Sequence, residues 1–120
     1  MIIAGTSLIT FLPASSNGQC VAGSDYFANI AFVDSNSNPY VPLSVSWYVY
    51  DTTNDMQVQG ISQIGAPATV NTIDIPAACN VLNNPQNLTE SRELVLLITV
   101  PGGTQRTDSA TYYVTAYVDF

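Results

Sequence analysis

The sequence contains no histidine and no lysine, and Arg92 and Arg106 are its only cationic side chains. Nucleophilic catalysis needs a Ser or Cys beside a base, usually histidine, so the common triads and dyads cannot be assembled. Nucleic acids and anionic membranes are bound through clustered Lys or Arg, which a chain of net charge −7 does not offer. We therefore expect a protein that is not an enzyme, holds no cofactor, and binds neither nucleic acid nor membrane.

The sequence is also poor in targeting signals and in cysteine. No segment reaches the length of apolar chain that spans a bilayer, and MIIAGTSLITF at the start has no basic region. If the chain is complete, we expect it to stay in the cytosol or to leave by a route other than Sec. Cys20 and Cys79 are the only cysteines, and in such a compartment we expect two unpaired thiols.

Metal and carboxylate sites have little support in the sequence. DSNSN (34–38) resembles the opening of a calcium loop, but Pro39 replaces the glycine and Val45 the glutamate that such loops require. We interpret it as a turn in which side-chain oxygens bond to the backbone, and expect no metal site. Glu90 and Glu93 flank Arg92, and we interpret these residues as a solvated ion-pair cluster.

Short apolar segments alternate with turn signals along the whole chain, a pattern typical of an all-β protein. Pro76 and the residues after it indicate one helical turn. Composition leaves a small barrel or jelly roll open, but the tryptophan in the third strand favours an Ig-like antiparallel β-sandwich of about seven strands. The predicted strands cover residues 3–11, 25–34, 44–51, 56–64, 72–75, 92–100 and 108–118.

Alternation of side chains along these strands predicts which of them form the core. The core should be built around Trp47 and contain Ile30, Phe32, Val45, Val49, Leu94, Leu96 and Ile98. Residues 1–24 find no obvious partner by this pattern, so we divide the chain into an N-terminal strand or arm over 1–24, suited to docking, and a sandwich domain over 25–120.

Some short motifs follow one another between residues 25 and 118. The first is a proline that precedes a strand containing tryptophan and ending in an acidic residue. The second is a strand that ends in a turn of small residues. A Glu-x-Arg sequence then leads into an apolar strand, and the last strand is rich in tyrosine. The residues concerned are Pro42, Trp47 and Asp51; Ile73, Ile75, Pro76, Ala77, Ala78 and Asn80; and Glu90 and Arg92. In these motifs the chain resembles Ig-like accessory structural proteins of tailed-phage virions, of the capsid decoration or cement type.

The resemblance implies a non-enzymatic structural protein of the virion that binds and reinforces the outer surface of a phage capsid. Its partner would be the major capsid protein or another virion protein, with homo-oligomeric copies in the assembled particle. It would lie on the capsid exterior, and in the host cytoplasm during assembly. Composition does not separate this role from that of a tail or head–tail connector component, or from a carbohydrate-binding or adhesion module.

Aromatic side chains on the face opposite Trp47 offer a candidate contact surface. An Ig-like sandwich places the third, sixth and last strands in one sheet, and aromatic patches often mark contact surfaces. The alternative is that these side chains only cover the sheet or lie under the N-terminal arm, and the sequence leaves the two open. The predicted protein-contact residues are Tyr48, Tyr50, Leu97, Tyr113 and Tyr117.

Overall fold

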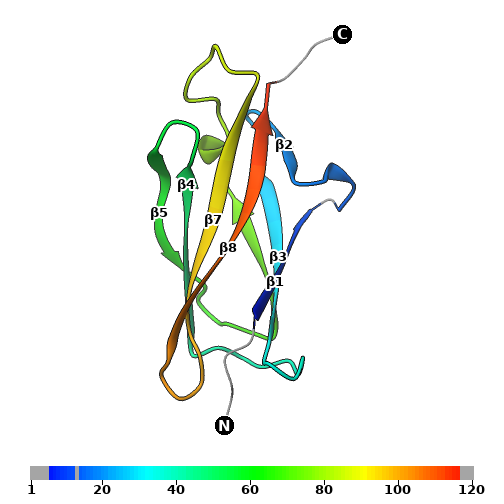
Figure 1. Cartoon of the computed structure of the whole chain (residues 1–120), viewed down its shortest axis with the longest axis vertical. Coiled ribbons are helices and arrows are strands. Elements are labelled where there is room, and N and C mark those ends of the chain that lie inside the picture. The colour runs from blue at the N-terminus through cyan, green and yellow to red at the C-terminus, as the bar shows by residue number, and fades with distance from the viewer. Residues whose placement is uncertain (1–5, 13, 117–120) are drawn as a thin grey trace.

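The computed structural model describes residues 6–12 and 14–116 and shows two β-sheets packed face to face (Figure 1). One sheet has three strands in the order β1-β3-β6, and the other has five in the order β2-β8-β7-β4-β5. The strands are β1 (Thr6–Leu12), β2 (Gln19–Val21), β3 (Tyr26–Val33), β4 (Ser44–Asp51), β5 (Met56–Gln63), β6 (Val70–Ile75), β7 (Thr89–Thr99) and β8 (Gln105–Thr115), with short 3-10 helices at Ala14–Ser16 (η1) and Ala77–Cys79 (η2).

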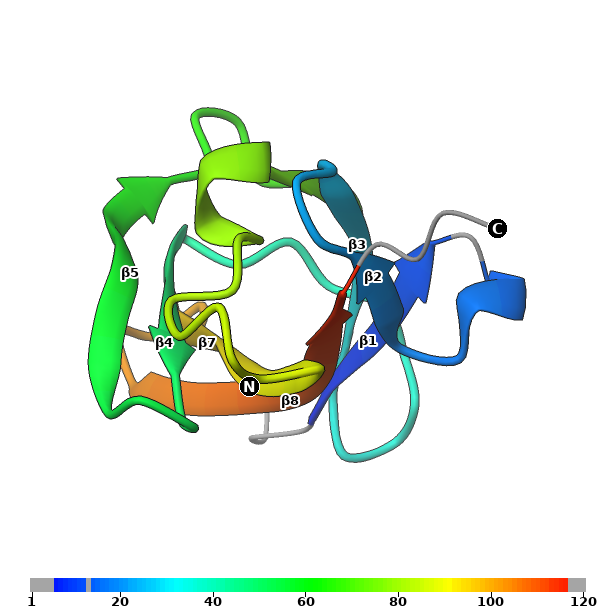
Figure 2. The same cartoon turned by 90° about the horizontal axis from the view of Figure 1, so that it is seen from above.

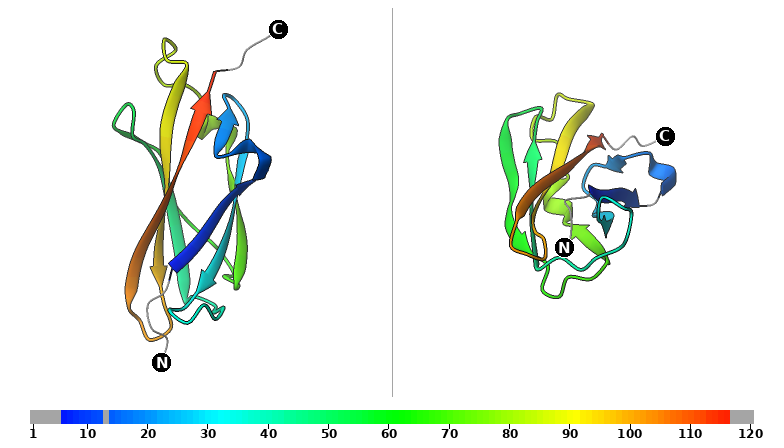
Figure 3. Two further views of the ribbon diagram at one scale, coloured as in Figure 1. Left: turned by 45° about the vertical axis from the view of Figure 1, so that its right-hand side comes forward. Right: turned by 60° about the horizontal axis from the view of Figure 1, so that its bottom comes forward.

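The strand order confirms the predicted Ig-like β-sandwich. β4, β7 and β8 are neighbours in one sheet, β5 extends that sheet beyond β4, and the remaining long strands form the facing sheet. Figure 2 shows the two layers from above, and Figure 3 shows that they twist across one another along the long axis. Nearly all strand pairs are antiparallel, but β2 runs parallel to β8.

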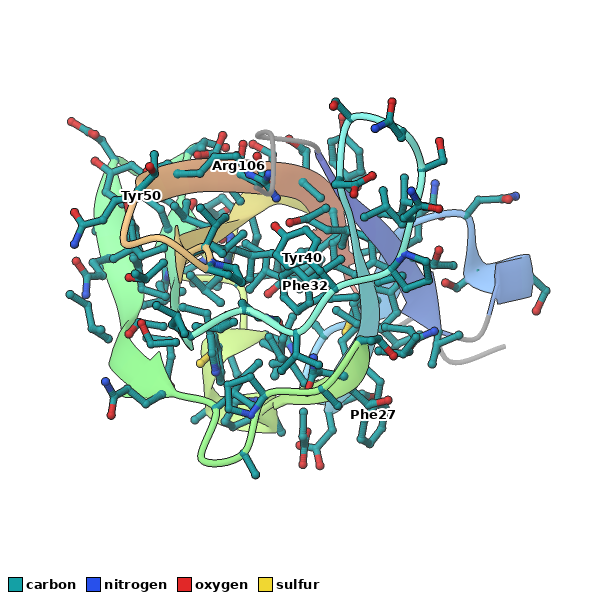
Figure 4. All side chains as sticks on the ribbon, turned by 90° about the horizontal axis from the view of Figure 1, so that it is seen from below. Phe27, Phe32, Tyr40, Tyr50 and Arg106 are labelled. Atoms are coloured by element: carbon teal, nitrogen blue, oxygen red, sulfur yellow. The ribbon has the colours of Figure 1, made fainter. Side chains whose placement is uncertain are left out.

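The core lies between the sheets and is the one predicted. Alternation on β4 buries Val45, Trp47 and Val49, with Trp47 only 7% exposed. In Figure 4, Phe32 lies between the layers, beside Tyr40 from the loop that follows β3. Every predicted core residue is buried: Ile30, Phe32, Val45, Trp47, Val49, Leu94, Leu96 and Ile98.

Eight strands lie within the described residues, and the one that the sequence did not predict is Gln19–Val21. This segment is too short to show a periodicity, and it is a strand because β8 offers it a free edge. The backbone enters it through Asn17 and Gly18, both with positive φ, a conformation that glycine adopts without steric cost.

The expected separation of residues 1–24 from the sandwich is wrong for the part that the structure describes. β1 pairs along its whole length with β3, from Thr6 opposite Val33 to Leu12 opposite Phe27. The chain then crosses to the other sheet and pairs as β2 with β8. Its apolar residues fill positions at the edges of both sheets, so this segment joins the two layers; residues 1–5 and 13 lie outside the described residues.

Candidate functional site

The structure places four of the five predicted contact residues on one face, the outer face of the five-stranded sheet. Tyr48, Tyr50 and Leu97 are partly exposed there, and Tyr113 is 44% exposed. The fifth, Tyr117, lies outside the described residues. We call this surface, formed by Tyr48, Tyr50, Leu97 and Tyr113, the tyrosine face.

Polar side chains divide the tyrosine face. Tyr50 is opposite Glu93, which is opposite Thr111, whereas Tyr113 is opposite Ser91. From the spacing of strands and residues in a sheet, the Cα atoms of Tyr50 and Tyr113 are separated by roughly 12 Å. The tyrosines therefore share a direction without forming one continuous aromatic platform.

Part of the tyrosine face is covered by its own side chains. Val95 points outward, opposite Tyr48, yet it is only 4% exposed, so its neighbours on this face shield it from water. Tyr50 donates a hydrogen bond to the Asp55 carboxylate in the next turn. That bond, together with the nearby negative charge, raises the pKa of Tyr50. Tyr48, which lies opposite Val95, and Tyr50, which is bonded to Asp55, therefore both make contacts within the chain itself.

The outer face of the three-stranded sheet also exposes apolar side chains. Leu8 and Val70 are each 52% exposed and Phe27 is 39% exposed. Figure 4 shows Phe27 pointing away from the core that contains Phe32. We call this surface the three-stranded face; it is formed by Leu8, Thr10, Leu12, Phe27, Asn29, Ala31, Val33, Val70, Thr72 and Asp74.

Sequence reasoning missed the three-stranded face, although a signal was present. The predicted core took Ile30 and Phe32 from the segment 25–34, which have the same parity as Tyr26 and Ala28. The opposite parity carries Phe27 and Val33, which are also apolar. A strand that is apolar on both sides either lies between two layers or leaves an apolar face open.

The interpretation of Glu90, Glu93 and Arg92 as a solvated cluster is wrong. β7 begins at Thr89, so these positions belong to a strand and alternate between its faces. Glu90 and Arg92 point into the sandwich and are fully buried, while Glu93 points outward. The guanidinium of Arg92 lies 3.0 Å from a Glu90 oxygen and 3.2 Å from an oxygen of buried Asp51.

The remaining hydrogen-bonding positions of Arg92 are filled by backbone oxygens of η2, of the loop after it and of β7. Its Nε donates to the backbone oxygen of Cys79 at 3.3 Å, and Nη2 donates to that of Val81 at 2.6 Å. Nη1 also donates to the backbone oxygen of Ser91 at 3.4 Å. A buried cation is tolerated when acceptors surround it in this way.

Hydrogen bonds hold both buried carboxylates in their charged form. Burial by itself would raise the pKa of Glu90, but donors outweigh it and lower the pKa to about 2. These donors include the backbone N–H groups of Asn84 and Asn83, at 2.9 and 3.0 Å from the Glu90 oxygens. At Asp51 burial is likewise outweighed, by bonds from Asn54 and Asn83 and by Arg92, and the pKa is lowered. With every oxygen engaged and no access for a substrate, these carboxylates are a structural network.

Both cysteines are free and buried, in agreement with the predicted unpaired thiols. Burial raises the pKa of the Cys20 thiol to about 11 and also raises the pKa of Cys79. Thiolate is the reactive form, so neither residue has the character of a nucleophile.

The Asp34 turn is the side-chain turn expected from the sequence. Its Oδ1 accepts hydrogen bonds from the backbone N–H groups of Asn36 and Asn38, both at 2.9 Å. Across residues 6–12 and 14–116, no group of three or more His, Cys, Asp or Glu side chains gathers in a way that could hold a metal ion. No helix within those ranges has the length and apolar character required to cross a bilayer.

Comparison with known proteins found no family model that matches this chain and no curated protein that matches it.

Proposed function

We propose that this chain is a non-enzymatic structural protein of a tailed-phage virion that binds and reinforces the outer surface of the capsid. The sequence resemblance supports the kind of particle. The observation that carries the binding role is the open apolar surface of the sandwich, with Leu8, Phe27 and Val70 all more than a third exposed on one face. Large apolar side chains exposed together on one face of a monomer commonly mark a contact with another protein.

The uncharged centre of the three-stranded face supports the same role. The whole chain has a net charge of −7, yet the outward positions of β1, β3 and β6 include one acid, Asp74. Asp74 lies at the edge of the face, and Thr10, Asn29 and Thr72 at its centre are uncharged, as the centres of interfaces usually are. The proposed partner is the major capsid protein, and copies of this chain would be held on the capsid exterior by binding to it.

Deleting the gene from a phage that carries it tests this proposal. Particles that lack the protein should keep their tails but release DNA at lower temperature or lower mechanical load, and added purified protein should restore their resistance. Particles without tails would instead indicate the connector role. Full resistance with normal assembly would contradict the proposal.

One observation favours a carbohydrate-binding module as the second candidate. A hollow of about 280 Å³ lies on the five-stranded sheet beside its β7–β8 hairpin, and it is lined by hydroxyl and amide side chains. These include Ser46, Thr107 and Gln105, and Tyr48 is the next outward residue after Ser46 along β4. Hydroxyl groups beside an aromatic ring could hold a sugar. Glycan-array binding that is lost on Ser46→Val would favour this candidate over capsid binding.

A further inference from the structure

We propose that the three-stranded face is the surface that docks on the capsid, and that it takes a protein surface with an apolar centre and a Lys or Arg opposite Asp74. This inference rests on the proposed function for the identity of the partner. It assigns the contact to the sheet opposite the tyrosine face.

The three-stranded face is arranged in rows across its strands. Leu8, Ala31 and Val70 form one row, since Ala31 of β3 pairs with both of the others. The next row, toward the other end of the strands, is polar and uncharged: Thr10, Asn29 and Thr72. The third row comprises Leu12, Phe27 and Asp74. A complementary surface would be apolar, with hydrogen-bonding groups in its middle and one cation at its edge.

A hollow at the end of this face offers a place for an anchoring side chain. It has a volume of about 320 Å³, and Leu12 and Phe27 line it together with Val21, which is 47% exposed. Apolar side chains that enter such pockets commonly provide most of the binding energy of an interface. The hollow is continuous with the third row because it shares Leu12 and Phe27 with it.

A second copy of this chain fits the face poorly in the two symmetric arrangements that align with its strands. A two-fold axis parallel to the strands would lay β1 of each copy over β6 of the other, so that Asp74 meets Leu12. An axis across the strands would place Asp74 over Val70. In both arrangements a carboxylate is buried against hydrocarbon without a cation, which is unfavourable.

The chain has no cation to spare for Asp74. Arg92 is fully buried and paired with Asp51 and Glu90, and Arg106 is paired with Asp108. Asp74 itself is exposed, and none of the ion pairs among the described residues includes it. A cation that pairs with Asp74 in the docked state would therefore come from the partner.

The test uses tailed-phage capsids purified from particles in which the gene is deleted, mixed with full-length protein and sedimented. Leu8→Thr with Val70→Thr removes apolar surface from the face and places at both positions a β-branched side chain, which suits strands. We expect this variant to bind about tenfold more weakly or worse than wild type. The rival variant, Tyr48→Ser with Tyr50→Ser, should bind within about twofold of wild type. Melting curves verify that both variants are folded.

Two further variants test the charge. Asp74→Asn should weaken binding about threefold and make it less sensitive to salt, and Asp74→Lys should weaken it about tenfold or more. Glu93→Gln removes an acid from the opposite face and serves as the matched control, with binding unchanged.

The outcomes separate the inference from the proposed function. If wild type does not bind capsids, the proposed function fails and the inference with it. If wild type binds and only the tyrosine variant loses binding, the capsid role stands and the three-stranded face is rejected. A wild-type dimer that the Leu8→Thr/Val70→Thr variant cannot form would also reject the inference, because the occupant would be a second copy.

Discussion

Arg92 and Arg106 are the only cations of the chain, and they lie near opposite ends of the same sheet, on β7 and β8. The Arg92 side chain is fully buried, and all three of its nitrogens have partners. The Arg106 side chain is 13% exposed and pairs with Asp108 at 3.1 Å. Its Nη1 is buried but has no partner among the described residues, and the same holds for the Tyr40 hydroxyl.

The difference between the two arginines lies in their acceptors. Around Arg92, a loop supplies backbone oxygens and its asparagines hold Asp51 and Glu90 in place. Around Arg106, Asp108 also accepts hydrogen bonds from the backbone and the hydroxyl of Ser7 on β1, and so joins the two sheets. One end of the sandwich is organised by a complete ionic network and the other by a single partly exposed pair.

Replacing Arg92 should have the largest effect on stability. Arg92→Met leaves two buried carboxylates without their cation, and breaking a buried ion pair in this way typically costs about 3–5 kcal/mol. Urea denaturation of the variant measures the loss, with Arg106→Met as the matched control. An Arg92→Met protein as stable as wild type would show that the network makes no net contribution to the free energy of unfolding.

Glu90→Gln should have the next largest effect, about 1–3 kcal/mol at neutral pH, because the amide cannot accept all the hydrogen bonds that the carboxylate accepts. The pKa of Glu90 is lowered from 4.5 to about 2 in the folded chain, so its stabilisation is complete above about pH 4.5. It is lost as the pH falls through the folded pKa. The difference in melting temperature between wild type and variant should therefore shrink from pH 5 toward pH 2. A difference that stays constant over this range would contradict the assignment.

Asp108→Asn tests the other end and should cost about 1–2 kcal/mol, since the amide replaces a carboxylate that accepts from Ser7 and Arg106. The loss should be concentrated at β1, where amide hydrogen exchange is the appropriate measurement. Faster exchange throughout β7 instead would indicate a global effect.

Arg106→Met should change the free energy of unfolding by less than about 1 kcal/mol, because partly exposed ion pairs contribute little and an unpartnered Nη1 is removed with the side chain. A loss as large as that of Arg92→Met would remove the distinction between the two ends.

The smallest effect concerns the thiols beside the Arg92 network. Cys79 supplies a backbone oxygen to Arg92, and both cysteines are buried. Both should react slowly with a thiol reagent in wild type, because burial raises their pKa values. Labelling should be faster in Arg92→Met than in Arg106→Met. Equal rates in the two variants would mean that the network does not hold η2.

Most of the fold could be predicted from alternation. The predicted strand register around Trp47 was correct because side chains alternate between the two faces of a strand. Once one face is known to be apolar, this alternation assigns every side chain of the strand to a face. The β2 strand could not be predicted, since three residues show no period and its partner lies more than ninety positions away. The sequence predicts a contact surface on the tyrosine face, because its tyrosines alternate with the core residues of the same strands. The exposure of Leu8 and Val70 could not be predicted, since it depends on which strands have no further layer of the fold above them.

The sequence by itself determined the acidity of the chain, the lack of the usual catalytic bases, the sandwich and its core. These properties follow from the composition and from the alternation of apolar and polar side chains along each strand. Only the tertiary structure decided that Arg92 is fully buried with Asp51 and Glu90 while Arg106 stays partly exposed with Asp108, because this depends on which segments bring acceptors to each end. It likewise decided that residues 6–21 join both sheets, since strand pairing is a contact between segments that are distant in the chain.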